Sequence, residues 1–372
     1  MSVHGDVVTV ALCGDVMLGR GIDQILPHPG DPTLREPSVR DARTYVALAE
    51  ARNGTIPRPV DVSWPWGDAL QVLIEARPDV LVVNLETSIT RSDDFAPGKV
   101  VHYRMSPDNL ASLSVARPDV CTLANNHVLD FGLGGLGETL EELSIAGLRA
   151  TGAGSDLDEA RRPAVVSLES GTRVLVFSVG MGSAGVPTRW AATADRPGVA
   201  VVPEASEASA QAVIDRIRQH RRPGDLVVVS LHMGSNWGYA IPDAQVGFAH
   251  ALIDGGVDLV HGHSSHHPRP IELYRDRLIL YGCGDLINDY EGIGGHDEYR
   301  SDLRLLYLVS VNAASGELVS SRMVPLHARR MRLEHASEAD AAWLRAVLDR
   351  VSRPFGPRVA LGVDGQLTLQ AP

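Results

Sequence analysis

Short apolar runs that end abruptly in polar turns constrain the fold of this chain more than any other feature of its sequence. Seven runs of strand length occur: VVTVALCGD, VLVVNLETS, VCTLANNH, VLVFSVG, DLVVVSLH, DLVHGHSSHH and RLILYGCGD. Their apolar residues are continuous rather than alternating, which is typical of strands covered on both faces. Helical segments at 135–148, 208–220 and 245–256 lie between several of them. The alternation predicts an α/β fold with largely parallel or mixed sheets.

A short repeat supports this interpretation. The pentapeptide Ala-Arg-Pro-Asp-Val occurs at 76–80 and again at 116–120, and each copy ends a helical stretch and opens a strand. Each strand then runs into a polar turn, Asn-Leu-Glu in the first case and Asn-Asn-His in the second. The two βα units are therefore expected to deliver their polar turns to the same edge of a sheet.

Two parts of the chain interrupt this pattern. Residues 27–66 are rich in Pro, Gly and Asp and have little periodicity apart from a helix near 40–51, so they predict a long loop insertion. Residues 303–352 predict a C-terminal β-hairpin that turns at 314–316, followed by a helix. Because no linker divides the sequence, a single domain is expected over 1–372.

The composition excludes several classes of protein. The net charge of −12 leaves no basic stripe for a nucleic acid. The N-terminal apolar run is too short for a signal peptide or an anchor, and no later stretch reaches spanning length, so a cytoplasmic protein without a membrane partner is expected. The cysteines Cys13, Cys121 and Cys283 fit small core residues in a reducing compartment. Lys99 is the only lysine, a bias towards arginine that we attribute to a GC-rich genome.

Polar side chains stand where five of the predicted strands end. They are Asp15, Glu86, Asn126, His127, His232, His263 and His266. Any one of them alone is more often a cap or a turn residue. In open α/β sheets, however, ligands bind beyond the carboxyl ends of the strands, and converging oxygen and nitrogen donors are what a divalent metal needs. The pattern therefore predicts a metal site at this edge.

Six ordered motifs carry a resemblance to a known family. They are GDVMLGR (14–20), NLETSIT (84–90), LANNHVLDFG (123–132), SLHMGSNWGY (230–239), GHSSHHPRPIELY (262–274) and ILYGCGDLIND (279–289). They resemble the successive motifs of the CapA-like proteins, a branch of the calcineurin-like metallophosphoesterases associated with poly-γ-glutamate capsule synthesis. The resemblance implies a calcineurin-like, four-layer α/β/β/α sandwich with the metal at the strand ends.

The resemblance also implies roles for individual residues. The metal ligands, or their close neighbours, would be Asp15, Glu86, Asn126, His232 and His266. His127 would stand in the proton-transfer position, with Asp130 or Asp15 as its acidic partner. Oxygen-rich coordination favours Ca²⁺ or Mn²⁺, whereas several imidazoles favour Mn²⁺, Fe or Zn²⁺.

The sequence departs from the superfamily pattern at both of its histidine motifs. Met17 occupies the histidine position of the opening Asp-x-His motif, and Ser264 occupies the first histidine position of the late His-x-His motif. A clamp of two metals would therefore be short of ligands. Capsule-type relatives are generally anchored outside the membrane, whereas no anchor is expected here. The missing ligands and the missing anchor both point away from phosphate ester hydrolysis and capsule export, towards a cytoplasmic reaction on another substrate.

The resemblance favours a metal-dependent peptide epimerase. CapA-like proteins of lasso-peptide gene clusters invert the Cα of the C-terminal residue of a precursor peptide. Removal of a Cα proton beside a carboxylate builds negative charge that a cation stabilises, and inversion needs one group to take the proton and another to return it. His127 with Asp130 is one candidate pair. The other is His296, with Asp297 or a nearer acid, on a glycine-rich loop where a solvated histidine is equally expected.

A peptide substrate also needs contacts with the protein. These are expected from Trp237, Asn125, His263 and Arg104. Arg20 is an alternative to Arg104, whereas Trp66 is expected in the core. Two other functions stay open: a metallophosphoesterase or a hydrolase related to γ-glutamyl polymers, and a metal-stabilised binding module without turnover, which the absent ligands at Met17 and Ser264 favour.

Overall fold

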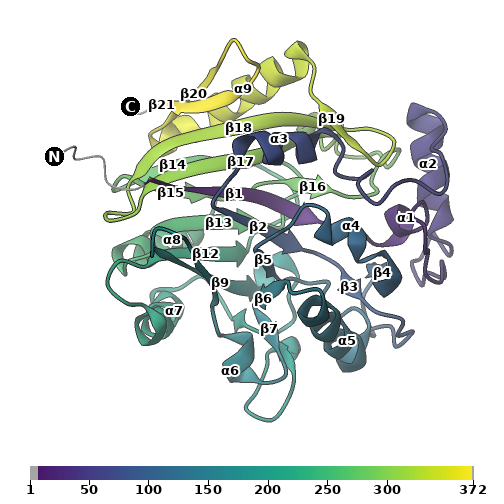
Figure 1. The fold of residues 1–372 in the computed structure, drawn as a ribbon, viewed down its shortest axis with the longest axis horizontal. Coiled ribbons are helices and arrows are strands. Elements are labelled where there is room, and N and C mark those ends of the chain that lie inside the picture. The colour runs from purple at the N-terminus through teal and green to yellow at the C-terminus, as the bar shows by residue number, and fades with distance from the viewer. Residues whose placement is uncertain (1–6, 371–372) are drawn as a thin grey trace.

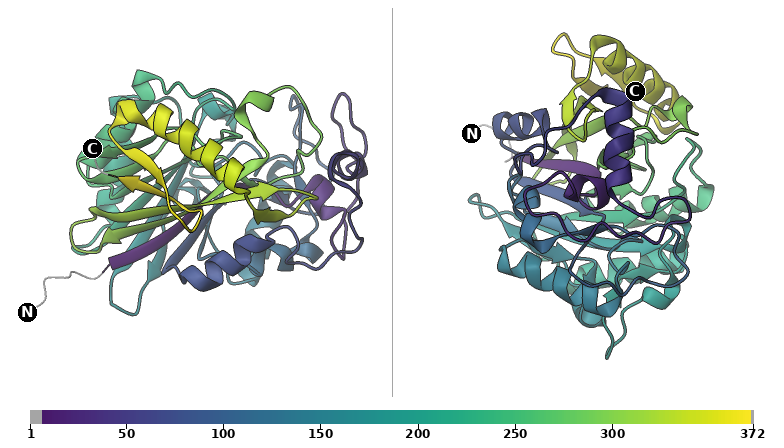
Figure 2. Two further views of the ribbon diagram at one scale, coloured as in Figure 1. Left: turned by 90° about the horizontal axis from the view of Figure 1, so that it is seen from above. Right: turned by 90° about the vertical axis from the view of Figure 1, so that its right-hand side faces the viewer.

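Two β-sheets pack face to face in the computed structural model of this chain, which describes residues 7–370 (Figure 1). Helices cover the outer face of each sheet, and the two further views show the layers from above and from the side (Figure 2). The predicted four-layer α/β/β/α sandwich is confirmed.

The first sheet has the strand order β20-β21-β18-β17-β1-β2-β5-β6, with β16 beside β1 and β19 beside β18. Its strands are β1 (Val7–Val16), β2 (Val80–Leu85), β5 (Val120–Thr122), β6 (Arg149–Thr151), β16 (Asp285–Ile287), β17 (Leu303–Asn312), β18 (Leu318–Ala328), β19 (Leu333–His335), β20 (Arg358–Leu361) and β21 (Leu367–Gln370). β1, β2, β5 and β6 run parallel, whereas β17, β18, β21 and β20 are antiparallel to their neighbours. β1 therefore lies where the parallel half meets the antiparallel half (Figure 1).

The second sheet has the order β11-β9-β12-β13-β15-β14, with β8 beside β9. Its strands are β8 (Ala164–Ser167), β9 (Arg173–Met181), β11 (Val201–Val202), β12 (Leu226–His232), β13 (Leu259–His263), β14 (Ile271–Tyr274) and β15 (Arg277–Leu280). Two short pairs lie outside both sheets: β3 (Ser88–Ile89) with β4 (Arg104–Met105), and β7 (Ala153–Gly154) with β10 (Gly198–Val199). β12 and β13 are parallel, so both deliver a histidine to the same edge.

The helices are short to medium in length. They are α1 (Arg20–Asp23), α2 (Arg43–Asn53), α3 (Asp68–Ala76), α4 (Ala111–Ser114), α5 (Gly132–Ile145), α6 (Leu157–Ala160), α7 (Glu207–His220), α8 (Asp243–Asp254) and α9 (Glu338–Ser352). α7 and α9 begin at the serine caps Ser206 and Ser337, whose hydroxyls accept a backbone N–H of the first turn. α2 falls inside the predicted insertion at 27–66. No helix within residues 7–370 is both long and apolar enough to cross a bilayer.

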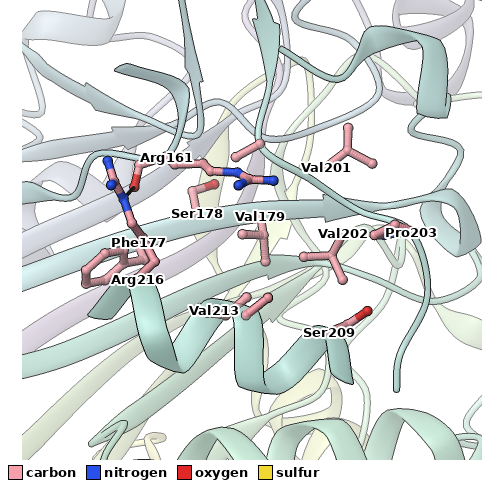
Figure 3. Close-up of a pocket in the computed structure, with 12 residues that line it drawn as sticks. Arg161, Phe177, Ser178, Val179, Val201, Val202, Pro203, Ser209, Val213 and Arg216 are labelled. Atoms are coloured by element: carbon pink, nitrogen blue, oxygen red, sulfur yellow. Dashed lines mark hydrogen bonds between the residues drawn. The ribbon is translucent and has the colours of Figure 1, made fainter. Parts of the chain in front are cut away.

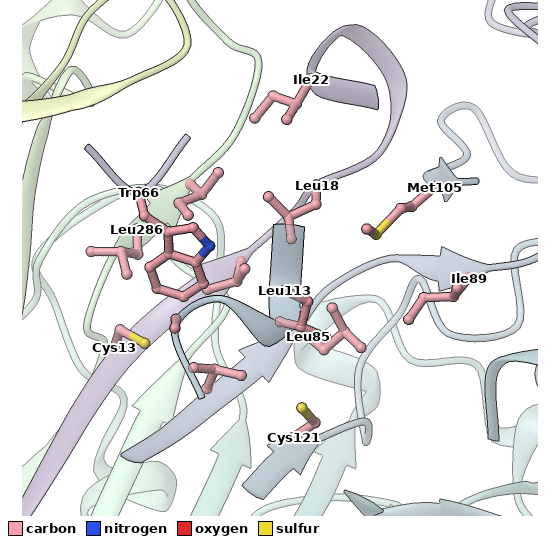
Figure 4. Close-up of a cluster of buried hydrophobic side chains, with 14 of the residues drawn as sticks. Cys13, Leu18, Ile22, Trp66, Leu85, Ile89, Met105, Leu113, Cys121 and Leu286 are labelled. Carbon is pink, nitrogen blue, oxygen red and sulfur yellow. The ribbon is translucent and has the colours of Figure 1, made fainter. Parts of the chain in front are cut away.

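Three hydrophobic clusters lie between the layers. The middle cluster joins side chains of β1, β2 and β17 to those of β9, β12 and β15, between the two sheets. A second cluster lies under α3 and α5, and a third under α7 and α8. Figure 4 shows part of the second cluster, with Trp66, Cys13 and Cys121 among aliphatic side chains. Trp66 is fully buried and donates its indole N–H to the Ser112 carbonyl (2.7 Å), so its predicted place in the core is confirmed.

The two Ala-Arg-Pro-Asp-Val copies have the same local structure. Arg77 and Arg117 both adopt the left-handed conformation (φ 45° and 53°), which ends each helical stretch before a proline. Asp79 and Asp119 then each accept a backbone N–H from the neighbouring strand, β1 and β2 respectively. β2 and β5 pair in parallel, so the prediction that both units end at one edge is confirmed.

The seventh predicted strand is confirmed in its apolar part, but the run does not stay within one sheet. The run RLILYGCGD forms β15 in the second sheet, then crosses to the first sheet, where β16 begins at Asp285 and pairs with β1. The crossing presses the Gly284 carbonyl against Gly14, where a Cβ atom would lie 1.5 Å from the oxygen. Only glycine fits at position 14. This contact places Asp285 directly opposite Asp15.

Candidate functional site

Three buried carboxylates meet at the carboxyl ends of β1 and β2 and the start of β16. They belong to Asp15, Glu86 and Asp285, which are 1%, 5% and 3% exposed. One oxygen of each lies within 4.8 Å of the others. Asp15 Oδ1 accepts a hydrogen bond from the Asn84 amide (2.7 Å), whereas its Oδ2 has no hydrogen-bond partner among the described residues. Because a buried, unpaired carboxylate oxygen is costly, this arrangement fits a further positive group.

The electrostatics of the three carboxylates also fit a cation. Burial raises the pKa of Asp15 to about 7, and the Asp285 carboxylate adds to the rise. Burial, followed by the charges of Asp15 and Asp285, raises the pKa of Glu86 well above its usual range. A divalent cation would offset the like charges and replace the lost hydration. Carboxylate oxygens are the ligands that Mg²⁺, Ca²⁺ and Mn²⁺ take in proteins.

Two imidazoles join the cluster from the second sheet. His232 ends β12 and His263 ends β13, and with Asp15 they form a second group whose ligand atoms lie within 4.8 Å of one another. The two Nδ1 atoms are 2.9 Å apart, and the Ser230 hydroxyl lies 2.7 Å from His263 Nε2. Burial holds the pKa of both histidines well below the usual value, so both rings are neutral, the form that binds metals. Asp15 is shared by an all-oxygen group and a mixed oxygen and nitrogen group.

His127 stands beside the cluster in a pair with a carboxylate. Its Nδ1 lies 2.6 Å from Asp130 Oδ2, and its Nε2 faces Glu86 Oε1 at 4.0 Å. Asp130 is fully buried and also binds the Lys99 ammonium and the Tyr103 backbone N–H. Burial lowers the pKa of His127 to about 4, against the pull of Asp130. A neutral imidazole that donates Nδ1–H to a carboxylate presents its lone pair at Nε2, towards the cluster.

His266 is the other imidazole of the site that is hydrogen-bonded to a carboxylate. Its Nδ1 lies 3.1 Å from both oxygens of Asp285. Burial opposes protonation of this ring, but the Asp285 carboxylate raises the pKa of His266 above the usual value. The residue also lines a cavity of about 220 Å³ with Trp237 and His296, whose rings stack at 4.1 Å. The cavity therefore lies between His266, which contacts Asp285, and the exposed loop that carries His296.

The structure brings the predicted ligands close together, but only some of them belong to the two groups that could hold a metal. Asp15, Glu86 and His232 belong to the two groups described above. Asn126 is partly exposed, and its Oδ1 lies 3.0 Å from His232 Nε2. His266 contacts the carboxylate of Asp285 instead. The metal-binding role of all five residues stays a prediction.

Three residues predicted to contact the substrate have side chains that are engaged within the protein, and their contact with substrate stays a prediction. Asn125 is fully buried, and its Oδ1 accepts hydrogen bonds from the backbone N–H groups of His127 and Val128. His263 is fully buried within the mixed group. The two terminal nitrogens of Arg104 are occupied by the carbonyls of Ser92 and Asp31. Trp237 is half-buried and lines the cavity, so its contact with substrate stays a prediction.

Two further candidates have partners that differ from those expected. His296 is exposed, and its ring stacks on Trp237; among residues 7–370 no carboxylate is hydrogen-bonded to it. Arg20 is buried, and its guanidinium is neutralised by Glu36 and Asp289, which leaves it unavailable for a substrate carboxylate.

The two departures from the superfamily pattern supply no ligand. Met17 is buried in the core, and the Ser264 hydroxyl donates to the backbone carbonyls of Met233 and Gly234. Asp285 instead provides a carboxylate that the motif comparison left without a role.

Asp285 is the site residue that the sequence interpretation missed, although a signal was present. The tripeptide Cys-Gly-Asp ends an apolar run at 13–15 and again at 283–285. The two copies lie side by side because β1 and β16 pair in parallel. Lys99 and Tyr103 were missed as well, because they lie in a segment without apolar periodicity and reach Asp130 only through the tertiary fold.

A separate cavity of about 120 Å³ lies between β9 and α7 (Figure 3). Its walls are mostly apolar, with Phe177, Val179 and Val213, and it includes Arg161 and Arg216. It shares no residue with the carboxylate cluster and is not part of this site.

Comparison with known proteins finds similarity over most of the chain. Residues 9–290 match the family described as bacterial capsule synthesis protein PGA_cap. A Mycobacterium tuberculosis protein named probable polyglutamine synthesis accessory protein is 56% identical over 368 residues, which are 99% of this chain and 97% of that protein. The PGA biosynthesis protein CapA of Bacillus subtilis is 26% identical over 285 residues, 76% of this chain and 64% of that protein.

Solved structures are also similar to this chain. A phosphatase from Mycoplasma pneumoniae has a TM-score of 0.43 at 11% identity, covering 87% of this chain and 94% of its own. A 5'-nucleotidase precursor from Thermus thermophilus has a TM-score of 0.47 at 15% identity, covering 94% of this chain and 59% of its own.

Proposed function

This chain belongs to the bacterial capsule synthesis protein family, and we propose that it is a metal-dependent hydrolase that cleaves amide bonds of a glutamine- or glutamate-containing polymer. The observation that carries the proposal is the buried cluster of Asp15, Glu86 and Asp285 beside the His127–Asp130 pair. The substrate class comes from the relatives, which are named for polyglutamine synthesis and for PGA biosynthesis.

The divalent ion would be held by Asp15, Glu86 and Asp285, with His232 and His263 in the second group that shares Asp15. Bound there, it would polarise the amide carbonyl and offset the charge that develops on the carbonyl oxygen. We expect Mn²⁺, because it accepts carboxylate and imidazole ligands together, whereas Ca²⁺ prefers oxygen alone.

The residues of the chain would carry the proton transfers. His127 Nε2 takes a proton from water as the water oxygen bonds to the carbonyl carbon. Asp130, at 2.6 Å from Nδ1, stabilises the imidazolium that results. The imidazolium returns the proton to the leaving nitrogen as the C–N bond breaks, so the products are a carboxylic acid and an amine.

Hydrolysis is tested with defined oligomers of glutamine and of γ-linked glutamate. The metal-free protein, the Mn²⁺-loaded protein and a His127→Gln variant are incubated with each oligomer, and new amino termini are counted by mass spectrometry. We expect shorter chains only with the loaded wild type, and wild-type rates for His335→Gln, a matched control at an exposed histidine. Intact oligomers after loading would overturn the proposal.

A second candidate is the inversion of a Cα centre in a peptide, which one specific feature favours. His127 and His266 each have a carboxylate partner at this site, and inversion needs two groups that exchange protons with one carbon. In D₂O an epimerase incorporates deuterium at Cα without shortening the chain, whereas a hydrolase shortens the chain without labelling Cα. One mass spectrum therefore separates the two reactions.

A further inference from the structure

Lys99 is the only lysine in a chain of 372 residues, and the other 33 of its 34 basic side chains are arginines. Arginine is used even where the cation is buried, as at Arg20, Arg269 and Arg304. The one position that carries an ammonium group is next to His127. A bias of the genome explains the arginines but gives no reason for this single exception.

The Lys99 ammonium connects three parts of the turn that carries His127. Nζ donates to Asp130 Oδ1 and to the Asn126 carbonyl, and it lies 3.3 Å from His127 Nδ1. Its side chain is 14% exposed, and Nζ lies 5.2 Å from the centre of the Trp190 ring. The group is therefore held by contacts on several sides rather than extended into solvent.

The hydrogen bonds of Asp130 explain why an ammonium group suits this position. Oδ2 is already taken by His127 Nδ1 (2.6 Å) and by the Tyr103 N–H (2.7 Å). Only Oδ1 is left for a cation. A guanidinium is a planar fork that pairs best with both oxygens of a carboxylate, whereas an ammonium is a compact donor that needs one. Arginine at position 99 would compete with His127 for Oδ2.

We propose that Lys99 is a positioning residue whose primary ammonium holds the His127–Asp130 pair in its working geometry, and that arginine does not replace it. The inference rests on the acid–base role proposed for His127. It predicts that loss of the ammonium leaves the fold intact, frees the Asp130 carboxylate to turn, and lets the His127 ring sample more than one tautomer and orientation.

Chemical rescue tests the proposal. Cys13, Cys121 and Cys283 are all buried, so in a Lys99→Cys variant only position 99 reacts with 2-bromoethylamine, which rebuilds a lysine-like ammonium. Loss of a residue that orients a catalytic group typically lowers activity about 10- to 100-fold. We expect a fall of this size in kcat for Lys99→Cys and Lys99→Arg, with KM little changed, and recovery only after aminoethylation. Alkylation with iodoacetamide, which adds a neutral amide, is the matched control.

A second readout needs no substrate. Long-range ¹H–¹⁵N NMR of the histidine rings reports the tautomer of His127, assigned with His127→Gln. The wild type and the aminoethylated variant should show the single Nδ1–H form, whereas Lys99→Cys and Lys99→Arg should show a mixture. If the wild type cleaves no polymer, the proposed function fails while the NMR result still decides the role of Lys99. A Lys99→Arg protein with wild-type NMR signals would overturn the inference, and so would full aminoethylation of Lys99→Cys without recovery of kcat. If the cysteine variant does not fold, Lys99→Arg alone tests the inference.

Discussion

Replacing Asp15 by asparagine removes the carboxylate that both candidate metal groups share. In the folded, metal-free protein, burial and then Asp285 raise the pKa of Asp15 to about 7. In an unfolded chain the same carboxyl titrates near about 3.9. Between these two pH values the folded protein keeps a proton at Asp15 that the unfolded chain has released. The contribution of Asp15 to the free energy of unfolding therefore falls as the pH rises through this window.

The size of the effect follows from the two pKa values. Their difference corresponds to roughly 4 kcal/mol of lost stability above pH 7, and Asp15 is buried enough that solvent does not screen it. The raised pKa of Glu86 acts in the same direction. The lowered pKa of Asp285 acts in the opposite direction, but its contribution is lost only below the ordinary aspartate range, outside this window. Asp15→Asn should therefore make the metal-free protein more stable at pH 8 by a few kcal/mol.

Urea unfolding followed by tryptophan fluorescence measures the change between pH 5 and 8, in EDTA and in Mn²⁺. Buried histidines whose pKa is lowered, such as His127, His232 and His263, make both proteins more stable as the pH rises towards about 6.5, so the quantity compared is the difference between the two proteins. We expect the stability of the metal-free wild type, relative to that of Asp15→Asn, to fall from pH 5 to 8. Mn²⁺ should restore the wild type at pH 8 and have little effect on the variant. Asp93→Asn, at an exposed aspartate, is the control for loss of one negative charge. A variant whose stability changes with pH by the same slope as that of the wild type would refute the reasoning.

Three further substitutions test other parts of the site and the core. His127→Gln should lower kcat by about 10²- to 10⁴-fold, which is the usual contribution of a general base, without lowering the melting temperature. Steady-state kinetics measures the first effect and a thermal scan the second. Normal turnover would exclude His127 as the base. Trp237→Ala should raise KM more than it lowers kcat, because the ring lines the access cavity; an unchanged KM in the oligomer assay would place the substrate elsewhere. Trp66→Ala should lower the free energy of unfolding, measured in urea, by roughly 3–5 kcal/mol, because it leaves a cavity in the second cluster. A decrease of less than about 1 kcal/mol would contradict that packing.

The layers of the fold could be predicted because continuous apolar runs report strands that are covered on both faces. The polar residue that follows each run also identified Asp15, Glu86 and His232, since parallel strands of one sheet end at the same edge. The sequence did not reveal that one run crosses between sheets. That crossing depends on the contact of Gly14 with Gly284, which lie far apart in the chain.

The partners of the site residues were harder to predict than the residues themselves. Asn125 and Asn126 are adjacent in the sequence, but only the fold shows that the first is buried in the turn and the second faces His232. β20 and β21 also escaped prediction, because strands of four residues have too few positions to show a period. Arg20 looked available for a carboxylate until the fold placed Asp289 against it.

Anomalous X-ray scattering from crystals grown with Mn²⁺ tests the central claim most directly, because it locates the ion independently of any substrate. We predict a peak about 2.0–2.6 Å from carboxylate oxygens of Asp15, Glu86 and Asp285, within reach of the His127 Nε2 side of the site. A protein that binds Mn²⁺ elsewhere, or that shows no peak at the three carboxylates at saturating metal, would contradict the account.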